Sequence, residues 1–129
     1  MNQRHILIVD DASTVRLYYR TVLEREGYFL SEAVNGLERL EKALSANPPF
    51  DLYIVDVNMP KLDGYGFLRE LRQQALPQVP ALMISTEEGH GDRLEALRAG
   101  ANYYLVKPVS PEELAAYCRL LLGGEESDE

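Results

Sequence analysis

The chain has little cysteine and no long hydrophobic run. Of its 129 residues only Cys118 is a cysteine, so no internal disulfide can form, as is usual in a reducing compartment. The apolar runs are a few residues long, whereas a helix needs about 20 apolar residues to cross a membrane. Residues 1–5 are polar and lead directly into a predicted strand, so we expect no signal peptide. We therefore expect a cytoplasmic protein with no membrane partner.

Positive charge is also scarce, because 13 Lys and Arg face 21 Asp and Glu, which gives a formal net charge of −8. Nucleic acids and anionic lipids bind to basic surfaces. The charge balance therefore argues against direct nucleic-acid binding and leaves protein partners open.

Several catalytic motifs are missing as well. The chain has no cluster of His and Cys that suits zinc, no Walker loop and no glycine-rich nucleotide cradle. It also has no Ser-His-Asp arrangement of a hydrolase. These absences argue against a zinc site, P-loop nucleotide binding and triad hydrolysis.

The chain does contain a set of short apolar runs that each end in a residue able to bind metal or phosphate. Continuous apolar runs of this length indicate strands buried on both faces of a parallel sheet. Parallel strands point the same way, so we expect the ends of these runs to meet at one edge of the sheet. The runs and the residues that follow them are Ile6–Val9 before Asp10 and Asp11, Leu52–Val55 before Asp56, Ala81–Ile84 before Ser85, and Tyr103–Val106 before Lys107.

Helix-like segments alternate with these strands. Apolar residues at helical spacing predict a helix over residues 14–26, ended by Gly27, and a strand follows at residues 28–33. Ser110 begins a capping box for a last helix, which runs to about Leu122. Three more helices are predicted from apolar stripes, formed by Leu37, Leu40 and Leu44, by Phe67, Leu68 and Leu71, and by Leu94 and Leu97, which we expect to face inward.

This order of elements predicts an α/β fold over residues 1–122, a doubly wound (βα)5 domain of the flavodoxin-like kind. Right-handed crossovers with helices on both faces favour a five-stranded parallel sheet in the order 2-1-3-4-5. In such a sheet ligands bind at the carboxyl ends of the strands, beside the point where the order reverses. Strands 1 and 3 flank that point and carry Asp10, Asp11 and Asp56. Residues 123–129 are predicted to be an acidic, disordered tail or the start of a linker.

Three carboxylates at one edge repel one another, and a bound divalent cation removes the conflict. Oxygen ligands favour a hard ion, so we predict a site for Mg²⁺ or Mn²⁺. A carboxylate can also act as a nucleophile toward phosphorus, and Lys107 and the Ser85 hydroxyl would then contact the phosphoryl group. Because the chain has no nucleotide cradle, the donor would be a protein partner or a small phosphodonor.

These residues resemble the response-regulator receiver domain of two-component signalling, which includes the chemotaxis regulators. Each motif alone is weak evidence, but their order and their positions at strand ends form a specific signal over the whole chain outside the tail. The motifs are the pair Asp10-Asp11, Asp56 with Asn58-Met59-Pro60 and Asp63-Gly64 after it, Ser85, and Lys107-Pro108.

The resemblance implies a role for each site residue. Asp56 would be the phosphoacceptor for a phosphohistidine of a sensor histidine kinase or a histidine phosphotransfer protein. Asp11, Asp56 and the backbone carbonyl of Asn58 would bind Mg²⁺ directly, and Asp10 would bind it through water. Lys107 would pair with the phosphate.

The resemblance also implies a switch. Ser85 fills the Ser/Thr switch position, and Tyr104 fills the aromatic position whose side chain swings inward on activation. The surface of the fourth helix, fifth strand and fifth helix would then repack for a downstream protein target. The protein would be a regulator rather than an enzyme, although it would assist its own phosphorylation and dephosphorylation. It would be a monomer or a phosphorylation-dependent dimer, either standing alone or cut from a larger protein.

Some positions bear on the details of this resemblance. Thr86 stands where the family usually has a very small residue, so we expect its side chain to restrict the access of water to the phosphoryl group and the entry of a small phosphodonor. Asn58 and Glu87 occupy positions at which the family tunes autodephosphorylation. The proline after Lys107 matches a position where the peptide bond is often cis.

Other functions share part of the pattern. A Mg²⁺-dependent aspartyl-phosphate phosphatase of the haloacid dehalogenase type would carry Asp-x-Asp after its first strand, whereas Asp56 follows the third predicted strand. A flavodoxin-like electron carrier would have a Ser/Thr-rich phosphate loop after strand 1, which this sequence lacks. A receiver-like scaffold that works without phosphorylation would not need the complete set of acids, hydroxyl and lysine. The phosphatase and the scaffold remain the alternatives to a phosphoacceptor switch.

Overall fold

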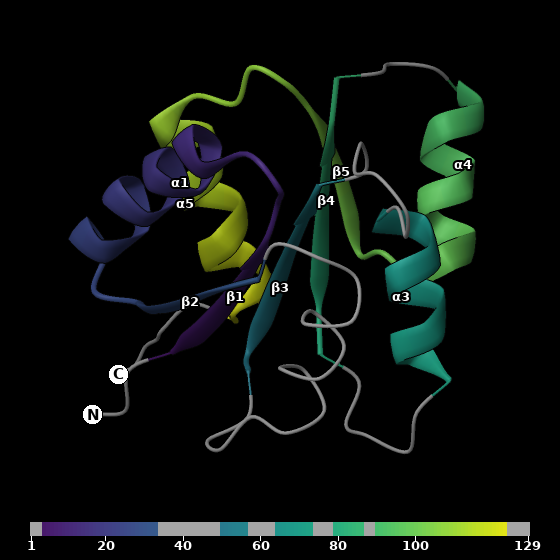
Figure 1. The fold of residues 1–129 in the computed structure, drawn as a ribbon, viewed down its shortest axis with the longest axis horizontal. Coiled ribbons are helices and arrows are strands. Elements are labelled where there is room, and N and C mark those ends of the chain that lie inside the picture. The colour runs from purple at the N-terminus through teal and green to yellow at the C-terminus, as the bar shows by residue number, and fades with distance from the viewer. Residues whose placement is uncertain (1–3, 34–49, 57–63, 74–78, 87–89, 124–129) are drawn as a thin grey trace.

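A five-stranded parallel sheet lies between two layers of helices (Figure 1). The computed structural model describes residues 4–33, 50–56, 64–73, 79–86 and 90–123. The strands are β1 (His5–Val9), β2 (Phe29–Ala33), β3 (Leu52–Asp56), β4 (Ala81–Ser85) and β5 (Tyr103–Val106). The helices are α1 (Ser13–Arg25), α3 (Gly64–Arg72), α4 (His90–Ala99) and α5 (Pro111–Leu121). The strand order β2-β1-β3-β4-β5 confirms the predicted α/β topology.

Some predicted features cannot be compared with this structure, because they lie outside the described residues. They are the helix with Leu37, Leu40 and Leu44, the loop residues 57–63, Glu87, and residues 124–129 of the predicted tail.

Apolar side chains on both faces of the sheet form the core. Helices α3 and α4 cover one face of the sheet, and α1 and α5 cover the other (Figure 1). Leu7 and Met83 belong to a buried cluster with residues of α3 and α4, and Ile8 and Leu82 belong to a second cluster with residues of α1 and α5. Burying one such side chain stabilises a protein by about 1.5–3 kcal/mol. In the part of the chain that the structure describes, no helix has the length and apolar character needed to span a membrane.

Two helix ends agree with the sequence predictions. The Ser110 Oγ accepts a hydrogen bond from the backbone N–H of Glu113 at 3.0 Å, so the predicted cap of α5 is confirmed. Gly27 follows the end of α1 with a φ of 92°, a conformation that glycine adopts without strain. The chain can therefore turn at once from α1 into β2.

The prediction that Leu94 and Leu97 face inward is wrong. Their side chains are 42% and 58% exposed, whereas Ala96 and Ala99 on the same helix are buried. Both pairs have the i, i+3 spacing of a helix face, so spacing alone could not distinguish them. Alanine side chains let α4 lie close to α3 and the sheet, where the larger leucines would have no room. The two leucines therefore form an exposed apolar surface on α4.

Gly100, which follows α4, has a positive φ like Gly27, and in addition it lies in close contact with the Arg72 side chain. It has a φ of 109°, and its carbonyl oxygen accepts hydrogen bonds from Arg72 Nε at 3.2 Å and Nη2 at 3.0 Å. A Cβ at Gly100 would lie 2.8 Å from Arg72 Cγ, whereas a Cβ at Gly27 would meet nothing within 4 Å.

We expect Gly100→Ala to lower the free energy of unfolding by about 2–3 kcal/mol and Gly27→Ala by about 1 kcal/mol. Both substitutions strain φ, but only the first also displaces Arg72 from its hydrogen bonds. Urea denaturation followed by circular dichroism measures both losses. Equal losses in the two variants would contradict the role given to Arg72.

Candidate functional site

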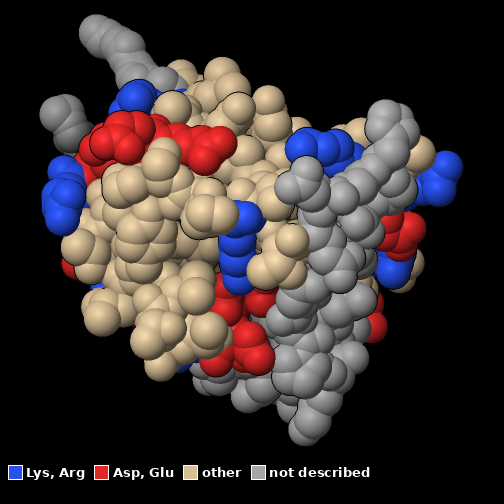
Figure 2. Space-filling model, turned by 90° about the horizontal axis from the view of Figure 1, so that it is seen from above, with Lys and Arg blue, Asp and Glu red and all other residues tan. Residues whose placement is uncertain are grey.

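The carboxyl ends of four strands meet at one edge of the sheet, as predicted. Asp10 and Asp11 follow β1, Asp56 ends β3, Ser85 ends β4, and Lys107 follows β5. One oxygen from each of the three carboxylates lies within 4.8 Å of the others. Seen from above, acidic and basic side chains lie next to one another near the centre of this face (Figure 2). The parallel sheet thus brings together residues that are far apart in the sequence.

Lys107 reaches across the edge to the acids. Its Nζ lies 3.2 Å from Asp56 Oδ1 and 3.9 Å from Asp10 Oδ2. Asp56 is buried and the Lys107 side chain is only 24% exposed, so their attraction is screened less than that of a surface ion pair. The backbone N–H of Lys107 donates to the Ser85 carbonyl at 2.7 Å, and the Lys107–Pro108 peptide bond is cis, as expected.

Asp10 is held at several points. Its backbone N–H donates to the carbonyl of Ala33 at 3.3 Å, and its Oδ1 accepts a hydrogen bond from the N–H of Ala12 at 2.9 Å. Its Oδ2 is buried and has no hydrogen-bond partner among the described residues. Desolvation by burial raises the pKa of Asp10 to about 6, although the Ala12 hydrogen bond opposes this, and the charge of Asp56 adds to the rise.

The acid cluster fits a hard divalent cation. All of its donors are carboxylate oxygens, the ligand type that Mg²⁺ and Mn²⁺ prefer. A cation would also compensate the buried Asp10 Oδ2, which the described part of the chain leaves without a hydrogen bond. Asp11 is exposed and opens the cluster to solvent. Asp10, Asp11 and Asp56 would hold the ion, while the other predicted ligand, Asn58, lies outside the described residues.

The two predicted switch residues lie on neighbouring strands. β4 and β5 pair with Met83 opposite Tyr104 and Ser85 opposite Val106. Ser85 is fully buried, and Tyr104 is 4% exposed in the core cluster on the α3–α4 side. The Arg93 guanidinium of α4 lies over the Tyr104 ring, 5.4 Å from its centroid. Tyr104 therefore occupies an inward position in this structure.

Sequence reasoning missed Arg16 and Glu32, which lie beside the site. Arg16 Nη1 donates to the carbonyl oxygen of Asp10 at 2.7 Å, and Arg16 Nε donates to Glu32 Oε1 at 2.7 Å. Arg16 and Arg20 are four residues apart, so the sequence indicates that they share a helix face. It does not indicate that this face meets β2, because that contact depends on how the helix packs on the sheet.

The chain matches the family model of the response regulator receiver domain over residues 6–119. The chemotaxis protein CheY1 of Helicobacter pylori (strain ATCC 700392 / 26695) is 38% identical over 120 residues, which cover 92% of this chain and 96% of that protein. The transcriptional regulatory protein ResD of Bacillus subtilis is 37% identical over 121 residues, which cover 94% of this chain and 49% of ResD. The chain thus spans about half the length of curated relatives such as ResD.

Solved structures show the same relationship. The chemotaxis response regulator CheY4 of Vibrio cholerae has a TM-score of 0.86 at 35% identity, and the match covers 93% of this chain and 99% of that one. A putative response regulator from Chloroflexus aurantiacus has a TM-score of 0.87 at 35% identity, covering 95% and 100%. The strand order and the match over nearly the whole domain show that this chain belongs to the receiver-domain family of two-component response regulators.

Proposed function

We propose that this receiver domain is a phosphoacceptor switch that takes a phosphoryl group onto Asp56. The observation that carries the proposal is the buried Asp56 carboxylate, which lies 3.2 Å from Lys107 Nζ and next to the carboxylates of Asp10 and Asp11. The donor would be the phosphohistidine of a sensor histidine kinase or of a histidine phosphotransfer protein, since the charge and motifs offer no nucleotide site.

Phosphoryl transfer requires mainly that the protein positions the reacting groups and neutralises their charge. A carboxylate oxygen of Asp56 attacks phosphorus, the P–N bond to the donor imidazole breaks, and the imidazole nitrogen takes a proton from solvent. Lys107 stands where it neutralises charge on the acceptor side and on the transferred group. A bound Mg²⁺ or Mn²⁺ supplies further neutralisation of the carboxylates and the phosphoryl oxygens. The Lys107 ammonium group also holds the Asp56 carboxylate in place during transfer.

The proposed switch connects Asp56 to α4 through β4 and β5. A phosphoryl group on Asp56 would attract the buried Ser85 hydroxyl, and Ser85 lies on the strand that pairs with the strand of Tyr104. Tyr104 packs beside α4. A change at Ser85 would therefore alter the equilibrium between the inward position of the Tyr104 side chain and an exposed position. Leu94 and Leu97 of α4 are exposed, and they would be part of the proposed α4-β5-α5 output surface that contacts a downstream protein target.

The remaining features of the proposal follow from this role. The protein acts as a regulator and not as an enzyme, except that it assists its own phosphorylation and dephosphorylation. It works in the cytoplasm as a monomer, or as a dimer that forms on phosphorylation, without direct contact to nucleic acid by the receiver domain. The family match over residues 6–119 favours this switch over a phosphatase. The close approach of Lys107 to Asp56 favours it over a scaffold that needs no phosphate.

The acceptor assignment predicts one phosphorylated residue. We expect the wild-type protein, incubated with phosphoramidate and Mg²⁺, to gain the mass of one phosphoryl group, and we expect Asp56→Asn to gain none, because its amide is a poor nucleophile. Intact-mass spectrometry measures the gain. Replacing Mg²⁺ by EDTA should slow the reaction about 100-fold or more, because the cation neutralises the transferred group.

Glu112→Gln is the matched control, since Glu112 is an exposed carboxylate on α5. It should be phosphorylated at the wild-type rate. A phosphoryl group that persists in Asp56→Asn would overturn the assignment to Asp56. Absence of any gain in the wild type, with phosphoramidate and with a cognate kinase, would overturn the proposed function. Continuous release of phosphate without a stable adduct would instead identify a phosphatase.

The burial of Asp10 predicts a pH-dependent stability in the absence of divalent cations. The pKa of Asp10 is about 6 in the folded protein, above its ordinary value near 4, so the folded state binds the proton more tightly than the unfolded state. The stability contributed by this proton is present at low pH and is lost as the pH rises through 6. Asp10→Asn should therefore stabilise the protein by about 2–3 kcal/mol at pH 7.5 and by much less at pH 4.5.

Urea denaturation in EDTA at the two pH values measures this difference. Asparagine keeps the oxygen that accepts the Ala12 hydrogen bond, so the comparison isolates the charge. Millimolar Mg²⁺ should stabilise the wild type more than Asp10→Asn. A difference between the two proteins that does not depend on pH would contradict the assigned cause.

A further inference from the structure

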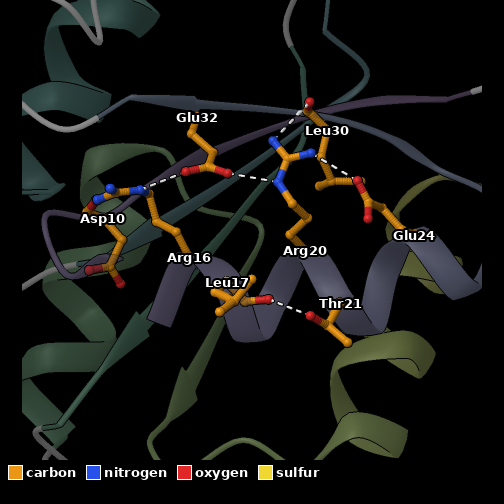
Figure 3. Close-up of polar contacts among 8 residues, drawn as sticks. All are labelled: Asp10, Arg16, Leu17, Arg20, Thr21, Glu24, Leu30 and Glu32. Atoms are coloured by element: carbon orange, nitrogen blue, oxygen red, sulfur yellow. Dashed lines mark hydrogen bonds and ion pairs between the residues drawn. The ribbon is translucent and has the colours of Figure 1, made fainter. Parts of the chain in front are cut away.

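A charged network connects the edge strand β2 with the acid cluster (Figure 3). Glu32 on β2 lies between two arginines of α1, with its Oε1 2.7 Å from Arg16 Nε and its Oε2 2.7 Å from Arg20 Nε. A second nitrogen of Arg16, Nη1, donates to the carbonyl oxygen of Asp10 at 2.7 Å. Arg16 thus joins a carboxylate on one strand to the backbone at the end of another.

The Asp10 carbonyl belongs to the peptide that leads into Asp11. The N–H of Asp10 and its Oδ1 are already occupied by Ala33 and Ala12. The Arg16 bond therefore fixes the orientation of the peptide between the two aspartates, at a bend where no regular strand or helix fixes it. Asp10 and Asp11, which both contribute a carboxylate to the acid cluster, lie on the two sides of this peptide.

The ion pair between Arg16 and Glu32 is more buried than a typical surface ion pair. The side chains of Arg16 and Glu32 are 15% and 29% exposed, so solvent screens their interaction incompletely. Burial alone would raise the pKa of Glu32, but hydrogen bonds from Arg20 and Arg16 outweigh it and lower that pKa. Glu32 accordingly stays ionised and keeps both arginines in place.

We propose that Arg16, anchored by Glu32, is a positioning residue for the divalent-cation site: it holds the Asp10 carbonyl and so sets the positions of the Asp10 and Asp11 carboxylates. This inference rests on the proposed function, in which the cluster binds Mg²⁺. The planar guanidinium is required because it donates from Nε and Nη1 in two fixed directions, whereas lysine offers one flexible ammonium group.

Arg20 offers a matched control. It binds the other oxygen of Glu32, and its remaining contacts are Glu24 and the carbonyl of Leu30. None of these groups belongs to the acid cluster. Loss of Arg20 therefore removes an ion pair of the same kind and length as that of Arg16 without removing a contact to Asp10.

The experiment measures Mg²⁺ binding by isothermal titration calorimetry, with Mg²⁺ alone as the probe. We expect Arg16→Ala to raise the Kd about tenfold, as is typical when a group that supports a metal ligand is lost. Arg16→Lys should raise it nearly as much, although it keeps the charge, and Arg20→Ala should leave it within about twofold. Amide resonances of Asp11 and Ala12 should shift in the Arg16 variants and not in Arg20→Ala.

A double-mutant cycle tests the anchor. Glu32→Ala should raise the Kd for Mg²⁺ less than Arg16→Ala does, and the double variant should bind no more weakly than Arg16→Ala alone, because the two residues act through one contact. Saturating Mg²⁺ should return the phosphorylation rate of Arg16→Ala to within about threefold of wild type, since Arg16 is proposed to act through the Asp10 carbonyl and the cation site and not on the acceptor itself.

The outcomes separate this inference from the proposed function. A wild-type protein that binds no Mg²⁺ and accepts no phosphoryl group would overturn both. A wild type that does both, with Arg16→Ala binding Mg²⁺ as Arg20→Ala does, would overturn the positioning role alone. Wild-type affinity in Arg16→Lys would also overturn it, because charge would then suffice. If Arg16→Ala does not fold, Arg16→Lys and Glu32→Ala carry the same test.

Discussion

Repulsion among three carboxylates at one edge of the sheet is the constraint on which the rest of the site depends. Parallel strands β1 and β3 place Asp10, Asp11 and Asp56 so close that their charges disfavour one another, and burial adds to the cost for Asp10. Lys107 offsets part of this cost from 3.2 Å, but a single ammonium group cannot neutralise three carboxylates. A cation bound at this edge would reduce the repulsion among the carboxylates, and this stabilisation would favour the binding of a metal ion.

The two apolar clusters on the faces of the sheet stabilise the fold against the repulsion at this edge. Leu7 and Met83 pack on the α3–α4 side, and Ile8 and Leu82 pack on the α1–α5 side, so the strand ends have no freedom to move apart. The same rigidity places Ser85 and the inward Tyr104 on paired strands. In the proposed switch, a change of charge at Asp56 would act on Ser85 and, through the pairing of β4 with β5, on Tyr104.

Much of this arrangement could be predicted from the sequence, for reasons that individual residues make clear. The short apolar run before Asp56 indicates a strand buried on both faces, and the carboxyl ends of parallel strands meet at one edge, so the acid edge could be predicted. The face of α4 did not follow, because Leu94 and Leu97 have the same spacing as Ala96 and Ala99 and only packing decides between them. Arg16 was missed for a related reason: its partners lie just after β1 and on β2, and no local pattern shows which strand a helix face will meet.

Arg16 connects two residues, Asp10 and Glu32, and the pKa values of their carboxyl groups are shifted in opposite directions. Burial raises the pKa of Asp10 to about 6, while hydrogen bonds from two arginines lower the pKa of Glu32 against the effect of its burial. The charge of Asp10 therefore changes with pH and with the binding of a cation under conditions in which Glu32 stays ionised. Because the hydrogen bond from Arg16 goes to the backbone carbonyl of Asp10 and not to its carboxylate, it does not depend on the charge of that side chain. We therefore expect the hydrogen bond from Arg16 to persist whether Asp10 is charged or protonated.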